Sequence, residues 1–458
     1  MESVEGPPTS FGREAQSAIY RDGVSGRTPR IPVGWPELER VARRHMSRAA
    51  YAYVAGSAGL ERTADANAEA FRRHHIVPRV LRDVLRRDLS IELFGVRRPT
   101  PFFLSPIGVL DLAHPDADAA AARAAATLGI PVALSNQAST PMEVVARAMD
   151  AGLAAHDHAA RWFQLYWSSS DDLVASLVGR AERAGCEAII VTLDTHLLGW
   201  RPRDLRLGYL PFSRGRGIAQ YTSDPVFQRL VRQRVDADRR AAAARKAGLE
   251  PSPAARPRIT PTTIASLVSI LRKHPGQLAQ NARSPLPRAS VETFLEVFAN
   301  PALTWDRLAF LREHTTLPIV LKGILHPDDA ARAIDAGVDG LVVSNHGGRQ
   351  IDGEIASLDA LPGVVEKVAG RIPVLFDSGI RSGSDALIAL ALGAAAVGIG
   401  RPYAYALAIA GEAGVRELLR NLTAELDITM GLAGVTSIDG LTSEILAARV
   451  DAVTDTPT

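Results

Sequence analysis

A histidine and an arginine lie three residues apart in the segment Ser344-Asn345-His346-Gly347-Gly348-Arg349-Gln350. The segment follows the apolar run Gly340-Leu-Val-Val343, which is typical of a buried strand. Because two glycines separate His346 from Arg349, both side chains can face one ligand with little bulk between them. Histidine transfers protons near neutral pH, and the planar guanidinium of arginine matches a carboxylate. The pair predicts chemistry at the α-carbon of a small acid; the alternative is a solvated loop with an incidental histidine.

Length and composition fit a large globular enzyme, with 458 residues, 47% of them hydrophobic and 22% charged. Lys+Arg 52 nearly balance Asp+Glu 50, and the net charge of +2 gives no reason to expect a nucleic-acid partner. The single cysteine, Cys186, excludes an intrachain disulfide and argues against a metal site built on cysteine. No apolar stretch reaches the roughly 18 residues of a membrane span, and no signal peptide is recognisable. We therefore expect a cytoplasmic protein that holds no metal.

Eight short β-rich runs alternate with segments of helical composition. The runs are Pro101 to Ser105, Ile130 to Leu134, Trp162 to Tyr166, Ala188 to Leu193, Pro318 to Lys322, Gly340 to Ser344, Ile372 to Phe376, and Ala394 to Gly400. Intervening segments such as 116–128 and 171–184 begin near Asp, Ser or Pro, as helices often do. This alternation predicts a parallel sheet covered by helices on its outer face. Eight such units predict a closed TIM (β/α)8 barrel of the α/β class rather than a doubly wound sheet.

Three segments fall outside this rhythm. Residues 1–32 are rich in Gly, Pro, Ser and Arg and predict a disordered or arm-like leader before a single barrel domain, 33–458. Within that domain, Trp35 to Tyr53 predicts an amphipathic helical extension on the N-terminal side. Residues 205–296 interrupt the barrel after its fourth strand, and loops of this length are usually functional or disordered. We interpret them as an inserted lid over the barrel mouth; the alternative is a surface excursion.

Polar side chains gather where the predicted strands end, which is where catalytic groups converge in such barrels. Lys322 is the clearest case, because a lysine that ends an apolar strand is rarely buried without an anionic partner. The residues at or just beyond these ends are Gln164, Tyr166, Thr192, Asp194, Arg201, Lys322, Ser344, His346, Arg349, Asp377, Gly379, Arg381, Gly400 and Arg401. A whole succession of strands with such ends predicts one shared site.

Two consecutive glycine-rich turns, Asp377-Ser-Gly-Ile-Arg381-Ser-Gly383 and Gly398-Ile-Gly400-Arg401-Pro402, each carry an arginine and open a helix. Backbone N–H groups at a helix start, beside a guanidinium, can bind an anion. Each turn alone could be structural, but two after the seventh and eighth strands predict a phosphate-bearing cofactor or substrate. No G-x-G-x-x-G follows an early strand, which disfavours a Rossmann nicotinamide site.

A phosphate-tethered cofactor beside His346 and two arginines suggests flavin mononucleotide (FMN) and oxidation of a 2-hydroxy acid. On these residues the chain resembles the FMN-dependent α-hydroxy-acid oxidase and dehydrogenase family, from about Trp35 onward and across every predicted strand. It is most similar to the lactate 2-monooxygenase branch. The segments that carry this closer likeness are Thr192-Leu-Asp-Thr195, Gly199-Trp-Arg-Pro-Arg-Asp204, Thr222-Ser-Asp-Pro-Val-Phe-Gln228 and Val374-Leu-Phe-Asp-Ser-Gly-Ile-Arg381.

The resemblance implies a role for each site residue. His346 would be the general base, and Asp194 would stabilise the imidazolium that forms. The substrate-binding residues that it implies are Arg201 and Arg349 for the carboxylate, with Tyr53 and the catalytic Tyr166 as hydrogen-bonding partners. The cofactor-binding residues that it implies are Pro106, Ile107, Gly108, Ser135, Gln164, Thr192, Lys322, Ser344, Asp377, Gly379, Arg381, Gly400 and Arg401; Lys322 also offsets the charge of reduced flavin.

Gln137 departs from the family pattern, in which glycolate-type members carry a bulky aromatic residue and the lactate monooxygenase branch an apolar one. A glutamine that faces the substrate would make the pocket more polar than a methyl group requires. This departure argues against lactate as the substrate without changing the reaction class.

The resemblance implies oxidation of a small L-2-hydroxy acid to the 2-keto acid by oxygen, followed by oxidative decarboxylation of the retained product. An oxidase that releases peroxide and a dehydrogenase that reduces a quinone or a protein remain alternatives. A flavin-binding redox sensor is a further alternative, although a sensor has no need of the carboxylate clamp formed by Arg201 and Arg349. Members of the family are commonly tetramers or octamers, so we expect a homo-oligomer.

Overall fold

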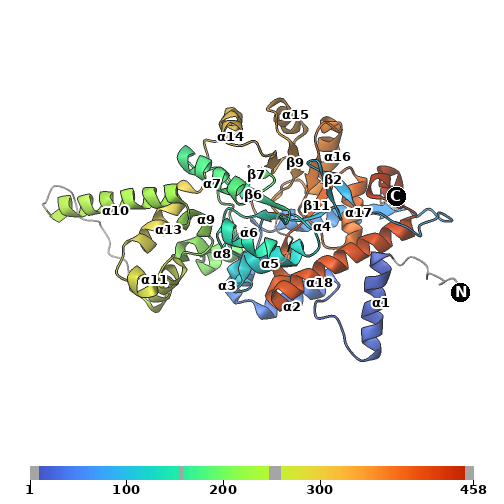
Figure 1. The fold of residues 1–458 in the computed structure, drawn as a ribbon, viewed down its shortest axis with the longest axis horizontal. Helices are drawn as coiled ribbons and strands as arrows, with labels where there is room; N and C mark the ends of the chain where they lie inside the picture. Colours follow the sequence, from blue (N-terminus) through green and yellow to red (C-terminus); the bar gives the residue numbers. More distant parts are fainter. Residues whose placement is uncertain (1–9, 152, 154–157, 247–258, 449–458) are drawn as a thin grey trace, which may run out of the picture.

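A closed parallel barrel of eight strands forms the centre of the molecule in the computed structural model, which describes residues 10–151, 153, 158–246 and 259–448 (Figure 1). The barrel strands are β4 (Phe102–Leu104), β5 (Val132–Leu134), β6 (Arg161–Leu165), β7 (Ile189–Thr192), β8 (Ile319–Lys322), β9 (Gly340–Val343), β10 (Val374–Phe376) and β11 (Ala396–Ile399). They run in chain order around the barrel, and β11 pairs in parallel with β4 to close it. The predicted (β/α)8 barrel is confirmed, and every predicted run overlaps one strand.

Apolar runs form these strands because both of their faces are covered. Every residue of β6 and β9 is buried, as expected where side chains fill the barrel and helices cover its outside. Phe103 packs against Trp162 inside, with ring centroids 5.3 Å apart. The turn between β2 (Ile91–Leu93) and β3 (Val96–Arg98) closes the end opposite the site, where Phe94 packs edge-on against Trp162.

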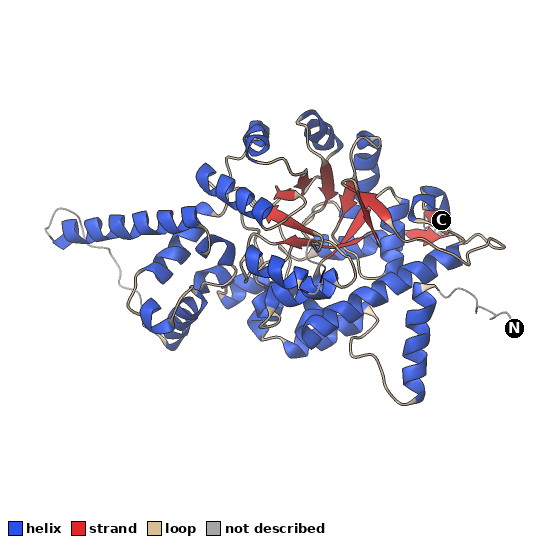
Figure 2. Ribbon diagram, viewed as in Figure 1, coloured by secondary structure: helices blue, strands red, loops and turns tan. Residues whose placement is uncertain are grey.

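Helices surround the strands as an outer layer (Figure 2). Those that follow barrel strands are α5 (Ala117–Ala126), α6 (Met142–Asp150), α7 (Asp171–Arg183), α15 (Pro327–Asp335), α16 (Ser357–Val368), α17 (Gly383–Ala391) and α18 (Arg401–Ala433). Helix α14 (Leu308–His314) precedes β8. In the described part of the chain, no helix is both long enough and apolar enough to cross a membrane.

The N-terminal extension predicted over Trp35 to Tyr53 is helical and consists of two helices there. Helix α2 (Trp35–His45) ends at Met46, whose backbone is extended, and α3 (Arg48–Ala55) starts anew. The Ser47 side chain caps α3 by accepting a hydrogen bond from the Ala50 N–H at 3.2 Å. The predicted helical extension is therefore confirmed, with a break at the capping serine. Helix α4 (Arg62–Arg72) completes the extension.

Part of the predicted leader is helical. Helix α1 (Phe11–Val24) packs against α18, where the Gly12 N–H donates to the buried Asp427 carboxylate at 2.8 Å. A β-carbon at position 12 would lie 2.6 Å from a carbonyl oxygen of α18, so only glycine allows this approach. Residues 1–9 lie outside the described part, so the prediction for the start of the leader is not tested.

The predicted insertion is mostly helical where the structure describes it, although residues 247–258 lie outside that part. Its helices are α8 (Pro202–Leu207), α9 (Ala219–Thr222), α10 (Pro225–Lys246), α11 (Pro261–Lys273), α12 (Leu278–Asn281) and α13 (Leu286–Val297). Helices α10, α11 and α13 extend the molecule to one side of the barrel (Figure 1). The carboxylate of Asp111, just beyond β4, ties the insertion to the barrel through Arg216 at 2.8 Å and Lys273 at 2.6 Å.

Candidate active site

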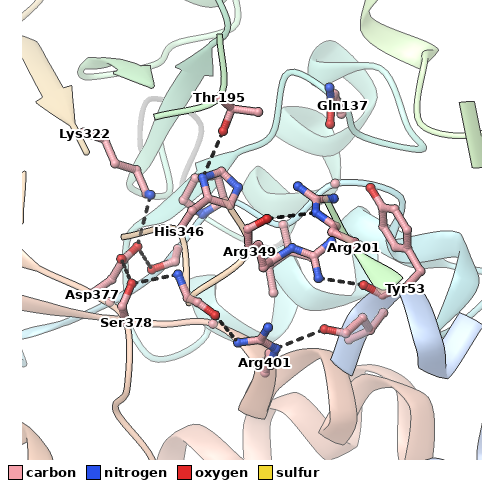
Figure 3. A pocket seen from close by; sticks show the side chains of 18 of the residues that line it. Tyr53, Gln137, Thr195, Arg201, Lys322, His346, Arg349, Asp377, Ser378 and Arg401 are labelled. Carbon is pink, nitrogen blue, oxygen red and sulfur yellow. Dashed lines mark hydrogen bonds and ion pairs between the residues drawn. The ribbon is translucent and has the colours of Figure 1, made fainter. Parts of the chain in front are cut away.

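A cavity opens where the barrel strands end, and most of the predicted site residues line it (Figure 3). The predicted residues in its wall are Tyr53, Pro106, Ile107, Gly108, Tyr166, Arg201, Lys322, His346, Arg349, Asp377, Gly379, Arg381, Gly400 and Arg401. Gln137 lines it as well. The convergence of side chains from so many strand ends is the arrangement expected of a TIM-barrel active site.

His346 faces this cavity with Asp194 behind it. The Nδ1–H of His346 donates to Asp194 Oδ1 at 2.7 Å, so Nε2 is the nitrogen that is free to accept a proton. Thr195 donates a further hydrogen bond of 2.9 Å to the same carboxylate oxygen. His346 has a φ of 56°, a left-handed conformation that costs a residue with a side chain free energy and is found chiefly at functional sites. The backbone turn therefore directs the imidazole into the cavity.

The ionisation of this pair suits a general base. Burial lowers the pKa of His346, and Asp194 opposes that change only in part, so the imidazole is neutral and able to accept a proton. Burial alone would raise the pKa of Asp194, but the adjacent His346 and Lys322 outweigh it and hold that pKa below its usual range. The Asp194 carboxylate is therefore a stable anion, placed to stabilise an imidazolium if His346 accepts a proton.

Lys322 is buried between two carboxylates at the end of β8. Its Nζ donates to Ser344 Oγ at 2.7 Å and lies 3.6 Å from Asp194 Oδ2 and 3.7 Å from Asp377 Oδ2. Burial acts to lower its pKa, but the attraction of Asp377 and Asp194 prevails, and the pKa is raised. Lys322 is thus a fixed positive charge in the cavity wall, close to two carboxylates.

Arg349 is held by the N-terminal extension. Its Nη1 donates to the carbonyl oxygens of Tyr53 and Gly56, each at 2.7 Å, and its guanidinium lies over the Tyr53 ring at 5.1 Å from the centroid. The second nitrogen, Nη2, makes no hydrogen bond within the described residues. It remains for a ligand, which suits the capture of a carboxylate.

Arg201 reaches the same cavity from the segment beyond β7. Its Nε donates to the Arg349 carbonyl at 3.1 Å and its Nη2 to Gln350 Oε1 at 2.9 Å. Burial, together with the nearby Arg349, lowers the pKa of Arg201 to about 10. Burial also raises the pKa of Tyr166 to about 12, so its hydroxyl keeps its proton. Two cations and a hydroxyl donor therefore face one small volume.

Arg401 lies beside Arg349 in the cavity, since both donate to the Gly56 carbonyl, and Arg381 lines the same cavity. Arg401 donates to the carbonyls of Val54, Gly347 and Gly56 at 3.1, 2.9 and 3.2 Å. Burial, with Arg349 nearby, lowers its pKa to about 9. The Arg381 guanidinium makes a single hydrogen bond within the described residues, to the Ile380 carbonyl at 2.9 Å.

Three further polar residues form a chain just behind the cavity wall. Ser135 Oγ donates to Gln164 Oε1 at 3.0 Å, and Gln164 Nε2 donates to Thr192 Oγ1 at 3.0 Å. The chain fixes which atom of each side chain is a donor and which is an acceptor. It crosses three adjacent strand ends, so it could match the polar edge of a planar heterocycle.

The residues present fit FMN. No carboxylate lies within 4.0 Å of the guanidinium nitrogens of the four cavity arginines in the described residues. Arg201 is buried and the other three are half-buried, so four cations largely withdrawn from solvent lack an anionic partner. Gly400 leaves more than 4 Å of free space where a β-carbon would be, which keeps backbone near Arg401 open to a phosphate. At Gly398, a β-carbon would lie 2.2 Å from Ser105 Oγ, so a side chain is excluded from the cavity floor.

A few predicted residues do not line the cavity themselves. Asp194, Ser135, Gln164, Thr192 and Ser344 lie directly behind it, each bonded to another predicted residue. Residues that the sequence reasoning missed are Ser105, Thr195, Leu198, Phe212, Phe298 and Ser378 in the wall, and Gln350 behind Arg201. Ser105, Thr195, Ser378 and Gln350 carried a signal, since each is a polar neighbour of a singled-out residue.

Comparisons with known proteins agree with this geometry. The FMN-dependent dehydrogenase family matches residues 42–448. The chain is 40% identical to an FMN-dependent alpha-hydroxy acid dehydrogenase, qulF, of Penicillium citrinum, over 94% of each chain. It is 39% identical to an L-lactate oxidase of Lysinibacillus sphaericus, over 91% of this chain and 93% of the relative. A crystal structure of mandelate oxidase with (S)-4-hydroxymandelic acid matches with a TM-score of 0.71 and 35% identity, over 92% of this chain and 100% of that one. The chain therefore belongs to the family of FMN-dependent α-hydroxy-acid oxidases and dehydrogenases.

Proposed function

We propose that this FMN-dependent oxidoreductase converts a small L-2-hydroxy acid to its 2-keto acid and passes the electrons to oxygen. The observation that carries the proposal is the pairing of a neutral His346, backed by Asp194, with two guanidinium groups in one cavity. A base and a carboxylate clamp at this spacing suit an acid whose reacting carbon is adjacent to its carboxylate.

In this proposal the substrate carboxylate binds Arg349 and Arg201. The Tyr53 and Tyr166 hydroxyl groups hydrogen-bond the substrate, and Tyr166 can do so as a donor because burial raises its pKa to about 12. His346 takes a proton from the substrate at Nε2, and the Asp194 carboxylate stabilises the resulting imidazolium.

The proposed cofactor residues would hold FMN by its two ends. Arg381 and Arg401 would bind the phosphate, with the Gly379 and Gly400 turns beside them, and Asp377 would bind the ribityl chain. Ser135, Gln164, Thr192 and Ser344 would support the ring edge, and the backbone of Pro106, Ile107 and Gly108 would lie along the ring. Bound FMN supplies the two-electron acceptor for the oxidation. Lys322 would offset the negative charge that reduction brings.

We further propose that the keto acid is retained and decarboxylated by peroxide formed from oxygen in the same cavity. The 2-keto acid and hydrogen peroxide then give the acid shorter by one carbon, carbon dioxide and water. Support comes from two side chains in the cavity wall: Phe212, which belongs to the insertion, and Phe298, which follows the end of the insertion. A lid built on these side chains would delay release of the product.

The fate of oxygen tests this proposal. Purified enzyme is supplied with oxygen and L-lactate, and with a panel of other L-2-hydroxy acids, and each product is quantified. We expect the shortened acid and carbon dioxide in amounts equal to the oxygen consumed. Stoichiometric peroxide with free keto acid would contradict retention and leave an oxidase.

The second candidate is such an oxidase, and the names of two relatives favour it. Both the Lysinibacillus sphaericus protein and a protein of Nostoc sp., 35% identical to this chain, are L-lactate oxidases. Slow reoxidation by oxygen, with fast reduction of an artificial acceptor, would instead indicate a dehydrogenase that uses a quinone or a protein.

We also propose that the protein acts in the cytoplasm as a homo-oligomer. Its one cysteine is reduced and buried, which suits a reducing compartment. Leu60 and Trp200 are apolar side chains that are 79% and 73% exposed, and burial against a partner subunit would remove them from water. Light scattering during size-exclusion chromatography checks the assembly, and a mass of 48.9 kDa, that of one chain, would contradict it.

A further inference from the structure

Helix α2 of the N-terminal extension contacts one of the cavity arginines through an aromatic ring. The Arg381 guanidinium carbon lies 4.0 Å from the centroid of the Trp35 ring. The other cation–ring distances in the described residues range from 4.8 to 5.5 Å, so this contact is the shortest. At this distance the ring face attracts the cation and restrains its position.

The Trp35 ring is itself fixed in place. It packs against Tyr405 of α18, with centroids 5.5 Å apart. The Tyr405 hydroxyl donates to Glu39 Oε1 at 3.2 Å, which ties α18 back to α2. The Tyr51 hydroxyl of α3 donates to the same oxygen at 3.0 Å. Three helices therefore hold the ring against the guanidinium.

Arg381 keeps most of its donors free in this arrangement. Its guanidinium donates one hydrogen bond, to the Ile380 carbonyl, and forms no ion pair within the described residues. A half-buried guanidinium of this kind, restrained on one face by a ring, presents its remaining N–H groups to a ligand in a fixed direction. Arg381 lines the cavity together with Gly379, Gly400 and Arg401, the residues proposed to bind the cofactor phosphate.

We propose that Trp35 is a positioning residue for the cofactor, whose ring orients the Arg381 guanidinium toward the FMN phosphate. The inference rests on the proposed phosphate site, and it gives the N-terminal extension a part in cofactor retention. The proposal has a specific consequence. Loss of the Trp35 ring should lower the affinity for a flavin that carries a phosphate and should leave the affinity for a flavin without one unchanged.

The test compares FMN with riboflavin, which has the same ring and ribityl chain but no phosphate. Native enzyme and Trp35→Leu are loaded with either flavin, diluted in series, and followed by the fluorescence of released flavin. For FMN we expect the dissociation constant of the variant to rise about three- to tenfold, the range for loss of one cation–π contact. For riboflavin we expect no change.

Matched variants separate positioning from general damage. Trp305→Leu removes another half-buried ring contacted by an arginine, Arg332 at 5.2 Å, remote from the cavity, and should release FMN as the native enzyme does. Trp35→Phe keeps a ring and should restore most of the affinity. If Trp35→Leu does not fold, Trp35→Met removes the ring with an unbranched side chain and receives the same comparison.

Two results would overturn the proposal. One is an unchanged FMN dissociation constant in the variant that lacks the ring. The other is an equal loss of affinity for FMN and riboflavin, which would assign Trp35 a structural role only. Neither depends on the identity of the hydroxy acid or on the fate of peroxide, so failure here is distinct from failure of the proposed reaction.

Discussion

The chemistry proposed for this site depends on a histidine that burial keeps neutral and an aspartate that its neighbours keep charged. Lys322 contributes to both effects, because its positive charge disfavours a second cation at His346 and favours the anion at Asp194. The three groups therefore form one electrostatic unit, in which a change at any member alters the others.

Removing the base tests the central assignment. We expect His346→Ala to retain FMN, because the proposed phosphate and ring contacts come from other residues. Reduction of the flavin by a 2-hydroxy acid should slow by about 10²-fold or more, the usual contribution of a general base. Anaerobic mixing, followed by the loss of flavin absorbance, measures the rate. A native rate in the variant would exclude His346 as the base.

The pH dependence of flavin reduction tests the pair. Because His346 must be neutral to accept a proton, and burial lowers its pKa, the rate should fall only as pH drops below the ordinary histidine value of about 6.5. Asp194→Asn removes the charge that raises this pKa, so the acid limb should move to lower pH. The maximal rate should also drop, since the imidazolium loses its partner. An acid limb that moves upward would contradict the arrangement.

Gln137 tests the specificity of the pocket. It is buried in the cavity wall, and its side-chain amide makes no hydrogen bond within the described residues. We expect Gln137→Leu to shift preference, measured as kcat/KM, from 2-hydroxy acids with a polar side chain toward aliphatic ones by about tenfold, roughly the value of one hydrogen bond. Equal changes for both classes would show that the amide does not meet the substrate.

At the scale of the element, two sets of polar contacts attach the insertion to the barrel layer. Arg180 of α7 is buried against Asp224, at 3.2 Å, and Asp111 binds two cations of the insertion. The Asp111 carboxylate, 3% exposed, binds Arg216 and Lys273 of the insertion and also accepts a hydrogen bond from Ser139 Oγ at 3.0 Å. Ser139 follows β5, two residues beyond Gln137. The position of the insertion is therefore coupled to a loop that lines the cavity.

Loosening this attachment should be measurable. We expect Asp111→Asn to increase the rate of limited proteolysis within the insertion about fivefold, because two partly exposed ion pairs of up to about 1 kcal/mol each are lost. Asp172→Asn, which removes an exposed pair with Arg229, serves as the control and should change little. If retention of the keto acid depends on the insertion, the Asp111 variant should also release more peroxide.

The barrel could be predicted from sequence because its strands are local signals: apolar runs such as that of β9, bounded by polar or glycine residues. The break between α2 and α3 was also locally encoded, in Ser47, but it competes with an uninterrupted helical periodicity. The contact between Trp35 and Arg381 was beyond prediction. It joins residues 346 positions apart, and neither the tryptophan nor its neighbours carry a pattern that names the partner.

The site residues likewise divide into those that local sequence signals could predict and those that depend on tertiary contacts. Residues at strand ends, such as Lys322, could be placed because chain order determines which edge of the barrel they share. Phe212 could not, since the path of an insertion depends on tertiary contacts rather than on periodicity.

At the scale of the whole molecule, one buried carboxyl group should give stability a recognisable dependence on pH. Burial raises the pKa of Asp118 from 3.8 to about 7. The unfolded chain therefore loses this proton near pH 4, and the folded protein keeps it to near pH 7. The folded state binds more protons in that window, so the contribution of Asp118 to stability falls as pH rises.

Asp118→Asn should remove this contribution, because an amide does not ionise and its oxygen can still accept from the Ser139 and Thr140 N–H groups. Between pH 4 and 7, the variant should gain at least about 1.4 kcal/mol in unfolding free energy relative to the native protein, the value of one pKa unit. Denaturant unfolding at several pH values measures the difference. Asp329→Asn, at the surface, provides the control, and parallel curves for all three proteins would contradict the prediction.

The carbonyl oxygen of Gly56 accepts hydrogen bonds from both Arg349 and Arg401. In the proposed function Arg349 binds the substrate and Arg401 the cofactor, so a single peptide group would support both ligands. If a ligand draws one guanidinium away from this oxygen, the hydrogen bond from the other guanidinium is expected to strengthen. Flavin loading should therefore alter the affinity for the hydroxy acid, and by linkage the acid must alter the affinity for flavin by the same factor.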